Sequence, residues 1–190
     1  MIGKENQRIK LTKVLLKKSL IELMHSKPIN KITIKELCEN ADINRSTFYL
    51  YYTDQFALLE EIEKELLLRV QQHLQKIDSS SDSQSFLIEL LRYIKDNADI
   101  FKTLLCHQEN LSFQSTFIDA TIKNLKFSLK LNCPENISYY IYNYLIMGCL
   151  SIIKQWIEAD FDLSCEYLAN MIYQLSDKAA SIYVTDDKLQ

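Results

Sequence analysis

Apolar residues recur at helical spacing along most of the chain. In the first long segment, residues 6–26, they return every three or four positions until Lys27-Pro28 bars continuation. The same spacing marks longer segments further on, at about 55–77, 87–94, 100–105, 118–129, 136–159 and 168–182. Together with two short helices between residues 33 and 52, the pattern predicts about nine helices.

The two short helices have clear start signals. Thr33-Ile-Lys-Glu36 has the form of a capping box, in which the Thr33 hydroxyl accepts from a backbone N–H and Glu36 reaches back to the cap. Asn44 is an N-cap residue for the second helix, residues 45–52. In the turn between them, Asp42 is one of the few residue types besides glycine that reach the left-handed region at modest cost. This arrangement predicts a helix-turn-helix.

The second short helix has a polar outer face. Phe48 is expected to point into the core, which leaves Arg45, Ser46, Thr47 and Tyr49 largely outward. A short helix that presents such side chains near its N-terminus fits the major groove of DNA.

Composition narrows the fold class. The chain has 190 residues with two Gly and two Pro, where average usage gives roughly 13 Gly and about 9 Pro. Sandwiches, barrels and Gly-rich phosphate loops need residues that tolerate unusual φ, so they are excluded. Since 47% of the residues are hydrophobic, disorder is excluded as well. We therefore predict an all-α protein.

Charge divides the chain unevenly. The net charge is −3, but residues 1–57 hold ten basic and six acidic side chains, and residues 58–190 hold 12 and 19. A basic end joined to an acidic remainder suggests that one part meets a polyanion, although a solvated charge gradient explains the counts equally well. Lys10, Lys13 and Lys17 line one helix face, which is either solvated or adds electrostatic steering toward DNA.

The remaining chemistry is sparse. The five cysteines are scattered with no CxxC pair, and with three His the sequence offers no zinc-ligand spacing. The start lacks an apolar signal segment, so we expect reduced thiols and a cytoplasmic protein. Residues 136–153 are uncharged, but their Asn, Ser and Tyr content favours a buried helix over a membrane span. The acidic, His and Cys residues form no cluster in the sequence that resembles a catalytic or metal site. We therefore expect that the protein is not an enzyme and binds no cofactor or metal.

One part of the chain resembles the DNA-binding domain of TetR-family transcriptional regulators. The resemblance is carried by Thr33–Tyr52 (TIKELCENADINRSTFYLYY) and by Gln55–Leu59 (QFALL), which follows it. The match covers about residues 8–60. This sequence departs from the family in having Asp42 where Gly is usual, Tyr52 where Phe is usual and Gln55 where Lys is common. The missing Lys implies a weaker phosphate contact, or one transferred to Lys31 or Lys35.

The resemblance implies a homodimeric, cytoplasmic repressor that binds a palindromic double-stranded operator and is released by a small apolar or amphipathic effector. Its DNA-binding domain would be residues 1–57, and residues 58–190 would bind the effector and form the dimer. The alternatives are an activator, a regulator that responds to a protein, and a helical adaptor that no longer binds DNA.

Residue roles follow from position in the motif. Thr33 would face a phosphate, Thr47 and Tyr51 would grip the backbone, and Arg45 and Ser46 would reach base edges. The complete DNA-binding set is Thr33, Lys35, Asn44, Arg45, Ser46, Thr47, Tyr49 and Tyr51.

The resemblance also implies an effector cavity and a dimer interface in the second part of the chain. The candidate pocket residues are Tyr93, Phe101, His107, Phe117, Tyr140, Tyr144 and Met147. Helical seams in the last two helices could pair with a second chain, although packing inside one chain uses the same spacing. The candidate interface residues are Ile141, Leu145, Gly148, Ile152, Leu168, Ile172, Leu175 and Ala179.

Overall fold

The structure, a computed structural model, describes residues 2–75, 83–106, 113–119 and 131–183. These ranges form helices and turns without a β-strand, which confirms the all-α class. The chain divides into two compact units, Met1–Leu66 and Leu67–Gln190. The first unit thus extends beyond the division expected after residue 57, and it includes the buried Leu58 and Ile62.

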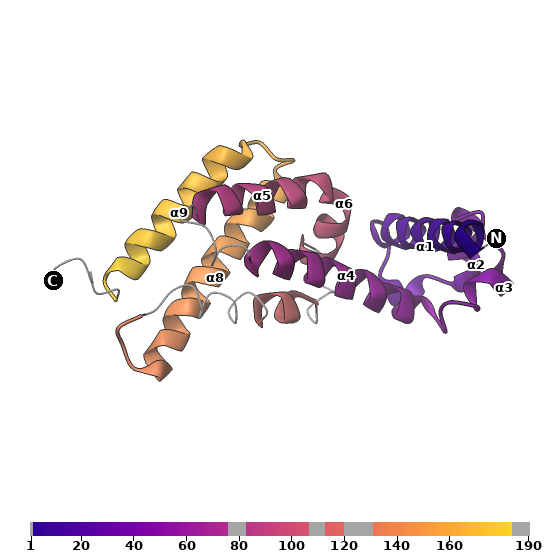
Figure 1. The fold of residues 1–190 in the computed structure, drawn as a ribbon, viewed down its shortest axis with the longest axis horizontal. Helices are drawn as coiled ribbons and strands as arrows, with labels where there is room; N and C mark the ends of the chain where they lie inside the picture. Colours follow the sequence, from indigo (N-terminus) through magenta and orange to yellow (C-terminus); the bar gives the residue numbers. More distant parts are fainter. Residues whose placement is uncertain (1, 76–82, 107–112, 120–130, 184–190) are drawn as a thin grey trace. The chain divides into compact units, whose positions relative to one another are not determined.

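The first unit contains α1 (Ile2–Met24), the 3₁₀ turn η1 (Ile29–Lys31), α2 (Ile34–Asn40), α3 (Arg45–Phe48) and the beginning of α4 (Gln55–Gln75). In this unit α2 packs on α1 and α3 packs on α2 (Figure 1). The side chains that are fully buried come from every one of these α-helices, because each turns one apolar stripe inward. They include Leu16, Leu20, Leu37, Phe48 and Leu58.

Helix α3 is shorter than the sequence predicted. It ends at Phe48, but the backbone continues in a tight turn through Tyr52. The N–H groups of Tyr51 and Tyr52 both donate to the carbonyl of Phe48, at 3.0 Å. The turn therefore keeps residues 45–52 in one short, hydrogen-bonded segment.

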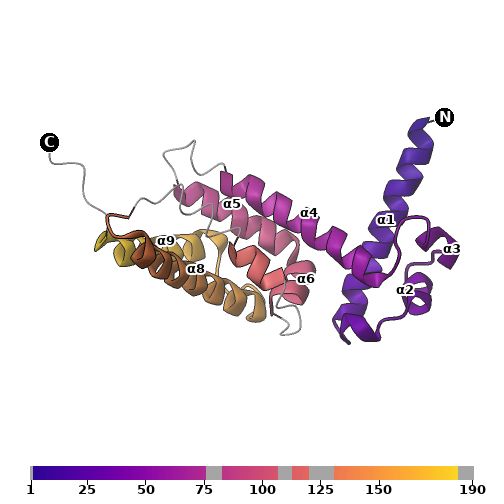
Figure 2. The same ribbon diagram turned by 90° about the horizontal axis from the view of Figure 1, so that it is seen from below.

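The second unit contains α5 (Ser83–Asp96), α6 (Ala98–Phe101), the π-helical turn η3 (Lys102–Cys106), α8 (Glu135–Glu158) and α9 (Cys165–Ser181). Helix α5 packs along α9, and α8 packs on both α9 and η3 (Figure 2). Their inward faces form the core of this unit. Its most deeply buried side chains include Leu91, Ile94, Phe101, Leu104, Leu105, Trp156 and Leu168.

One predicted helix lies mostly outside the described residues. The structure describes a helical segment at 113–119, which begins earlier than the 118–129 expected, and residues 120–130 are outside the described ranges. Phe113 and Phe117 of this segment are buried, with ring centroids 6.1 Å apart.

Candidate nucleic-acid interface

Local chemistry fixes the helix-turn-helix as the sequence predicted. The N–H of Glu36 donates to the Thr33 hydroxyl at 3.2 Å, and the Glu36 carboxylate accepts from the Thr33 backbone N–H at 3.4 Å, which completes the capping box. A hydrogen bond from Lys27 holds the pKa of Glu36 below its usual value. Asp42 has φ 53°, so it occupies the left-handed position expected of it. The N–H of Ile43 then donates to the carbonyl of the buried Cys38 at 2.9 Å.

Asn44 begins α3 by capping it. Its side-chain oxygen accepts from the Ser46 N–H at 3.0 Å and from the Ser46 hydroxyl at 2.9 Å. The cap fixes the N-terminal end of α3 where Arg45 and Ser46 are exposed. Asn44 therefore orients the neighbouring side chains through its own hydrogen bonds.

Two aromatic side chains anchor the segment from inside. Phe48 is fully buried and Tyr52 is 5% exposed, with ring centroids 5.6 Å apart. Tyr49 points outward, but its ring meets that of Phe48 edge-on at 5.5 Å, so the core limits how Tyr49 can turn. Because these anchors face inward, the polar side chains of α3 face outward.

The other predicted contact residues lie on the same α2–α3 part of the first unit. Thr33 and Lys35 are exposed, and Lys35 pairs with Glu39 at 3.9 Å. Thr47 and Tyr51 are half-buried. The eight side chains are thus gathered on one short stretch, with Arg45 and Ser46 exposed near its N-terminal end.

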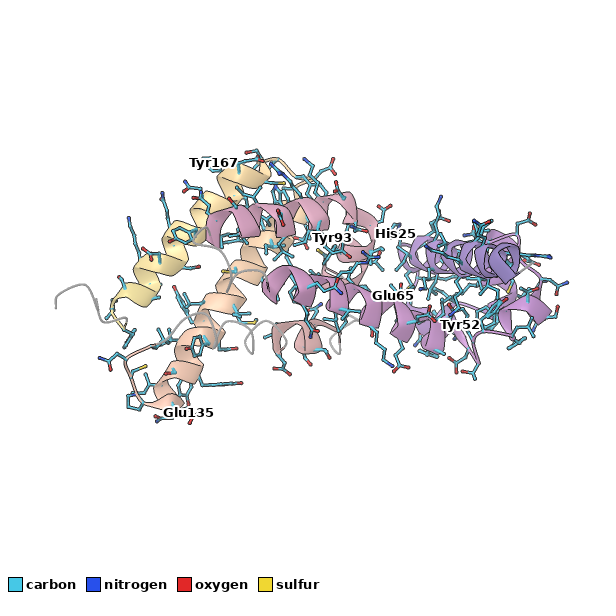
Figure 3. The ribbon with its side chains drawn as sticks, viewed as in Figure 1. His25, Tyr52, Glu65, Tyr93, Glu135 and Tyr167 are labelled. Carbon is cyan, nitrogen blue, oxygen red and sulfur yellow. The ribbon has the colours of Figure 1, made fainter. Side chains whose placement is uncertain are left out.

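A charged cluster between α1 and α4 was not expected from the sequence. Lys17 pairs with Glu61 at 2.8 Å and with Glu65 at 2.7 Å, and Lys13 pairs with Glu61 at 3.2 Å. Burial raises the pKa of Glu61, but hydrogen bonds from Lys17 and Lys13 outweigh it and hold the pKa below its ordinary value. Glu65 is labelled on α4 in Figure 3. The sequence signal was a pair of basic and a pair of acidic residues, each at i,i+4 spacing.

This cluster changes the role of the α1 lysines. We expected Lys13 and Lys17 to form a solvated face or to steer DNA, but both are paired with α4 carboxylates in the structure. The ammonium of Lys13 also lies 5.4 Å from the ring centroid of Tyr52 and 6.0 Å from that of Tyr51. Lys13 thus links α4 to the end of the α3 segment.

The hydroxyl of Tyr52, which is labelled in Figure 3, is buried and makes no hydrogen bond of good geometry to the described residues, although the Glu61 carboxylate lies nearby. Burial raises its pKa, and the nearby Glu61 carboxylate raises it further. The hydroxyl is thus a buried polar group beside the Lys13 ammonium and the Glu61 carboxylate.

The candidate pocket residues of the second unit divide into two groups. Phe101 and Phe117 are buried, and Tyr93, labelled in Figure 3, packs edge-on against Phe101 at 5.8 Å. Tyr140, Tyr144 and Met147 instead lie on the exposed face of α8. In the part of the chain that the structure describes they face away from the core, because α8 turns its opposite face inward. His107 lies outside the described residues.

The candidate dimer residues divide in the same way. Leu145, Leu168 and Ile172 are buried within the single chain, so they have no surface left for a partner. Leu175 and Gly148 are exposed, while Ile141, Ile152 and Ala179 are half-buried.

The exposed face of α8 is unusually apolar, whereas α9 exposes both apolar and charged side chains. The outer face of α8 presents Ile137, Tyr140, Tyr144 and Met147, and its stretch from 136 to 153 has no charge. An added Cβ at Gly148 would meet nothing within 4 Å. On α9 the exposed apolar side chains are Tyr167, labelled in Figure 3, Tyr173 and Leu175. Patches of this kind commonly mark interaction surfaces.

A three-helix unit that holds a short polar helix outward, joined along the chain to a larger helical unit, is the architecture of a helix-turn-helix transcriptional regulator. Residues 81–178, more than half of the chain, match the family TetR_C_8, described as a transcriptional regulator C-terminal region. The chain belongs to the TetR family of transcriptional regulators.

A curated relative is also a helix-turn-helix transcriptional regulator by name. The uncharacterized HTH-type transcriptional regulator YxbF of Bacillus subtilis (strain 168) is 22% identical over 167 residues. The match covers 84% of this chain but 43% of YxbF, so this chain spans less than half the length of that relative.

Solved structures show the same fold. NalD, the secondary repressor of the MexAB-OprM multidrug efflux pump in Pseudomonas aeruginosa, has a TM-score of 0.67 at 14% identity, over 93% of this chain and 97% of NalD. FadR from Bacillus subtilis, solved in complex with stearoyl-CoA, has a TM-score of 0.62 at 13% identity, over 86% of this chain and 96% of FadR. Within the described ranges, no helix of our structure combines the length and hydropathy that a membrane span requires.

Proposed function

We propose that this chain binds a palindromic DNA operator as a homodimer, through the segment from Asn44 to Tyr52. The observation that carries the proposal is the orientation of this segment. Phe48 and Tyr52 hold it from inside, so Arg45, Ser46 and Tyr49 point away from the core. Arginine and hydroxyl side chains on a short helix can form hydrogen bonds to base edges in the major groove.

The test is selection of bound duplexes from a random DNA pool, using the full chain. We expect an inverted repeat whose half-sites lie about 34–36 Å apart, or a multiple of one helical turn. Enrichment of a single unpaired half-site would overturn the dimer. Enrichment of no sequence would overturn DNA recognition and favour the helical adaptor.

The exposed faces of α8 and α9 support the dimer. The outer face of α8 presents aromatic and aliphatic side chains with no charge from 136 to 153, whereas a solvated helix face is normally polar, and α9 adds Tyr167, Tyr173 and Leu175. Gly148 leaves open space in the outer face of α8, where a partner helix could approach closely. The proposed interface therefore rests on Tyr140, Tyr144, Met147, Gly148 and Leu175, and a two-fold axis would place the same faces of both chains together.

The proposed effector is a small apolar or amphipathic molecule that binds in the second unit. Tyr93, Phe101 and Phe117 remain candidates because they lie in or at the edge of its aromatic interior. Stearoyl-CoA is a suitable first probe, because the structurally similar FadR was solved with it. If this chain is a repressor, the probe will release it from the selected operator while free coenzyme A will not; operator binding strengthened by the probe would indicate an activator.

We infer that the chain acts in the cytoplasm as a regulator without enzymatic activity. Its family and its curated relative are transcriptional regulators, and operator DNA is cytoplasmic in bacteria. Stearoyl-CoA recovered unchanged after incubation with the protein would agree with this assignment, and its hydrolysis would contradict it.

A further inference from the structure

An exposed leucine lies beside the polar side chains of the α3 segment. Leu50 is 75% exposed, the highest value of any large hydrophobic side chain described in the first unit. It sits in the turn that continues α3, where its N–H donates to the Thr47 carbonyl at 3.3 Å. Its two neighbours do have partners within the unit. The Tyr49 ring meets the Phe48 ring edge-on, and the Lys13 ammonium lies over the Tyr51 ring.

Position places Leu50 on the proposed DNA-reading face. The hydrogen bond from the Leu50 N–H to the Thr47 carbonyl closes a turn of three residues, which brings Leu50 next to Thr47. Ser46 is exposed and Thr47 half-buried, and both belong to the proposed contact set. An apolar side chain in this place disrupts an otherwise polar surface and gains nothing from the core of its own unit.

The chemistry of the major groove offers one apolar group to such a side chain. Base edges there present hydrogen-bond donors and acceptors, and the C5-methyl group of thymine is the exception. A leucine on the reading face would bury its methyl groups against that of thymine and would gain nothing from cytosine. An exposed leucine is unremarkable when it stands alone on a surface, but here its neighbours are the proposed base-reading side chains.

We propose that Leu50 is a specificity-determining residue, which selects a thymine in each half-site by contact with its C5-methyl group. This inference rests on the proposed DNA-binding function and adds to it a base preference. It predicts a selected operator that contains a thymine whose methyl group matters, at symmetric positions in the two half-sites.

The experiment removes the methyl groups one at a time. In the selected operator, each thymine is replaced by deoxyuridine, which keeps every hydrogen-bonding group, and affinity is measured by mobility shift at fixed salt. We expect the wild-type chain to lose about fourfold in affinity per half-site at one thymine position, the effect of one buried methyl group. Leu50→Ala should bind the thymine and deoxyuridine operators equally.

Leu11→Ala is the matched control. Leu11 is also an exposed leucine of the first unit, at 59%, but it lies on α1 outside the proposed contact set. This variant should keep the wild-type preference for thymine. Because Leu50 makes so little contact with the core, Leu50→Ala should fold normally, and an unchanged far-UV circular dichroism spectrum and melting temperature would confirm it.

The possible results distinguish failure of the thymine contact from failure of DNA binding itself. If the chain selects no duplex, the DNA-binding function fails and the inference fails with it. If an operator is selected but the wild type and Leu50→Ala respond alike to every deoxyuridine, Leu50 does not read a methyl group while the function stands. If 5-methylcytosine strengthens binding and no deoxyuridine weakens it, the methyl group that the protein contacts belongs to methylated cytosine. The thymine assignment is then overturned.

Discussion

Arg45 is the exposed cation at the first position of α3, next to the cap formed by Asn44. If it reads a base, Arg45→Ala should weaken operator binding by about 1–3 kcal/mol and relax the choice at one base position of each half-site. Titration against the operator and its single-base variants measures both effects. Arg69→Ala, which removes an exposed arginine from α4 in the second unit, should leave the base preference as it was. An Arg45→Ala protein with the wild-type preference would remove Arg45 from the reading set.

Tyr52 has a buried hydroxyl that makes no hydrogen bond of good geometry to the described residues, although the Glu61 carboxylate lies nearby. A buried hydroxyl without a partner costs about 1–3 kcal/mol in desolvation. Tyr52→Phe should therefore stabilise the first unit by about 1 kcal/mol, since the phenyl ring keeps the packing and removes the hydroxyl. Slower amide hydrogen exchange in α1 and α2 would report the gain.

Tyr142→Phe is the matched control for that substitution. Tyr142 is also 5% exposed, but its hydroxyl has a backbone hydrogen bond at Leu131. Removing this hydroxyl should destabilise the second unit, so the two tyrosines should respond with opposite signs. Faster exchange in α1 and α2 of Tyr52→Phe would show that the Tyr52 hydroxyl is satisfied in solution.

At the scale of elements, the contact between α1 and α4 depends on Glu61, which accepts from both Lys13 and Lys17. Glu61→Gln keeps the shape but removes the charge that both lysines neutralise. We expect the first unit to lose about 1–2 kcal/mol near pH 7, because hydrogen bonds between charged groups in a partly buried network exceed those of isolated surface pairs. Amide exchange in α1 measures the loss. Glu60→Gln, from an exposed pair with Lys64, should have little effect.

The pH dependence of the same contact has a defined sign. The pKa of Glu61 is lower in the folded chain than its ordinary value of 4.5, so its contribution is fully present above pH 4.5 and is lost as the pH falls through the lowered folded-state value. The destabilisation caused by Glu61→Gln should therefore shrink in acid. A difference between variant and wild type that stays constant down to pH 3 would contradict the assignment.

How well the sequence predicted each element depended on how local its determinants are. The helix-turn-helix was predictable because the hydrogen bonds of the Thr33 box, the Asp42 turn and the Asn44 cap join residues at most five positions apart. The Lys13–Glu61 contact joins residues 48 positions apart, and no periodicity in either helix specifies that pairing. Local chemistry therefore defined the motif, whereas the contact behind it required the tertiary structure.

At the scale of the whole molecule, spacing could not tell packing within a chain from packing between chains. Leu168, Ile172 and Leu175 follow one helical seam of α9, yet the first two are buried in the chain and the third is exposed. Helix α5 packs along α9 and contributes to this burial. A substitution such as Ile172→Asp would consequently unfold the second unit, so it cannot serve as a test of the dimer.

Tyr144 provides that test. It is 71% exposed on α8 of the single chain, so Tyr144→Glu should fold normally and yet place a charge in the proposed apolar interface. We expect a monomer by sedimentation velocity, with operator affinity reduced at least tenfold because both half-sites no longer bind together. Leu68→Glu, at an exposed leucine of α4, should remain dimeric. A dimeric Tyr144→Glu protein would place the interface elsewhere.

The loop after α8 gives the molecule a spectroscopic label of its own. Asp160 and Phe161 turn the chain with φ 54° and 61°, the indole N–H of Trp156 donates to the Leu163 carbonyl at 2.9 Å, and the Phe161 ring stacks edge-on against the indole. Trp156 is the only tryptophan of the sequence and is 2% exposed. Excitation at long ultraviolet wavelengths will therefore yield blue-shifted emission from the second unit alone, so its melting can be followed in the intact protein without interference from the first.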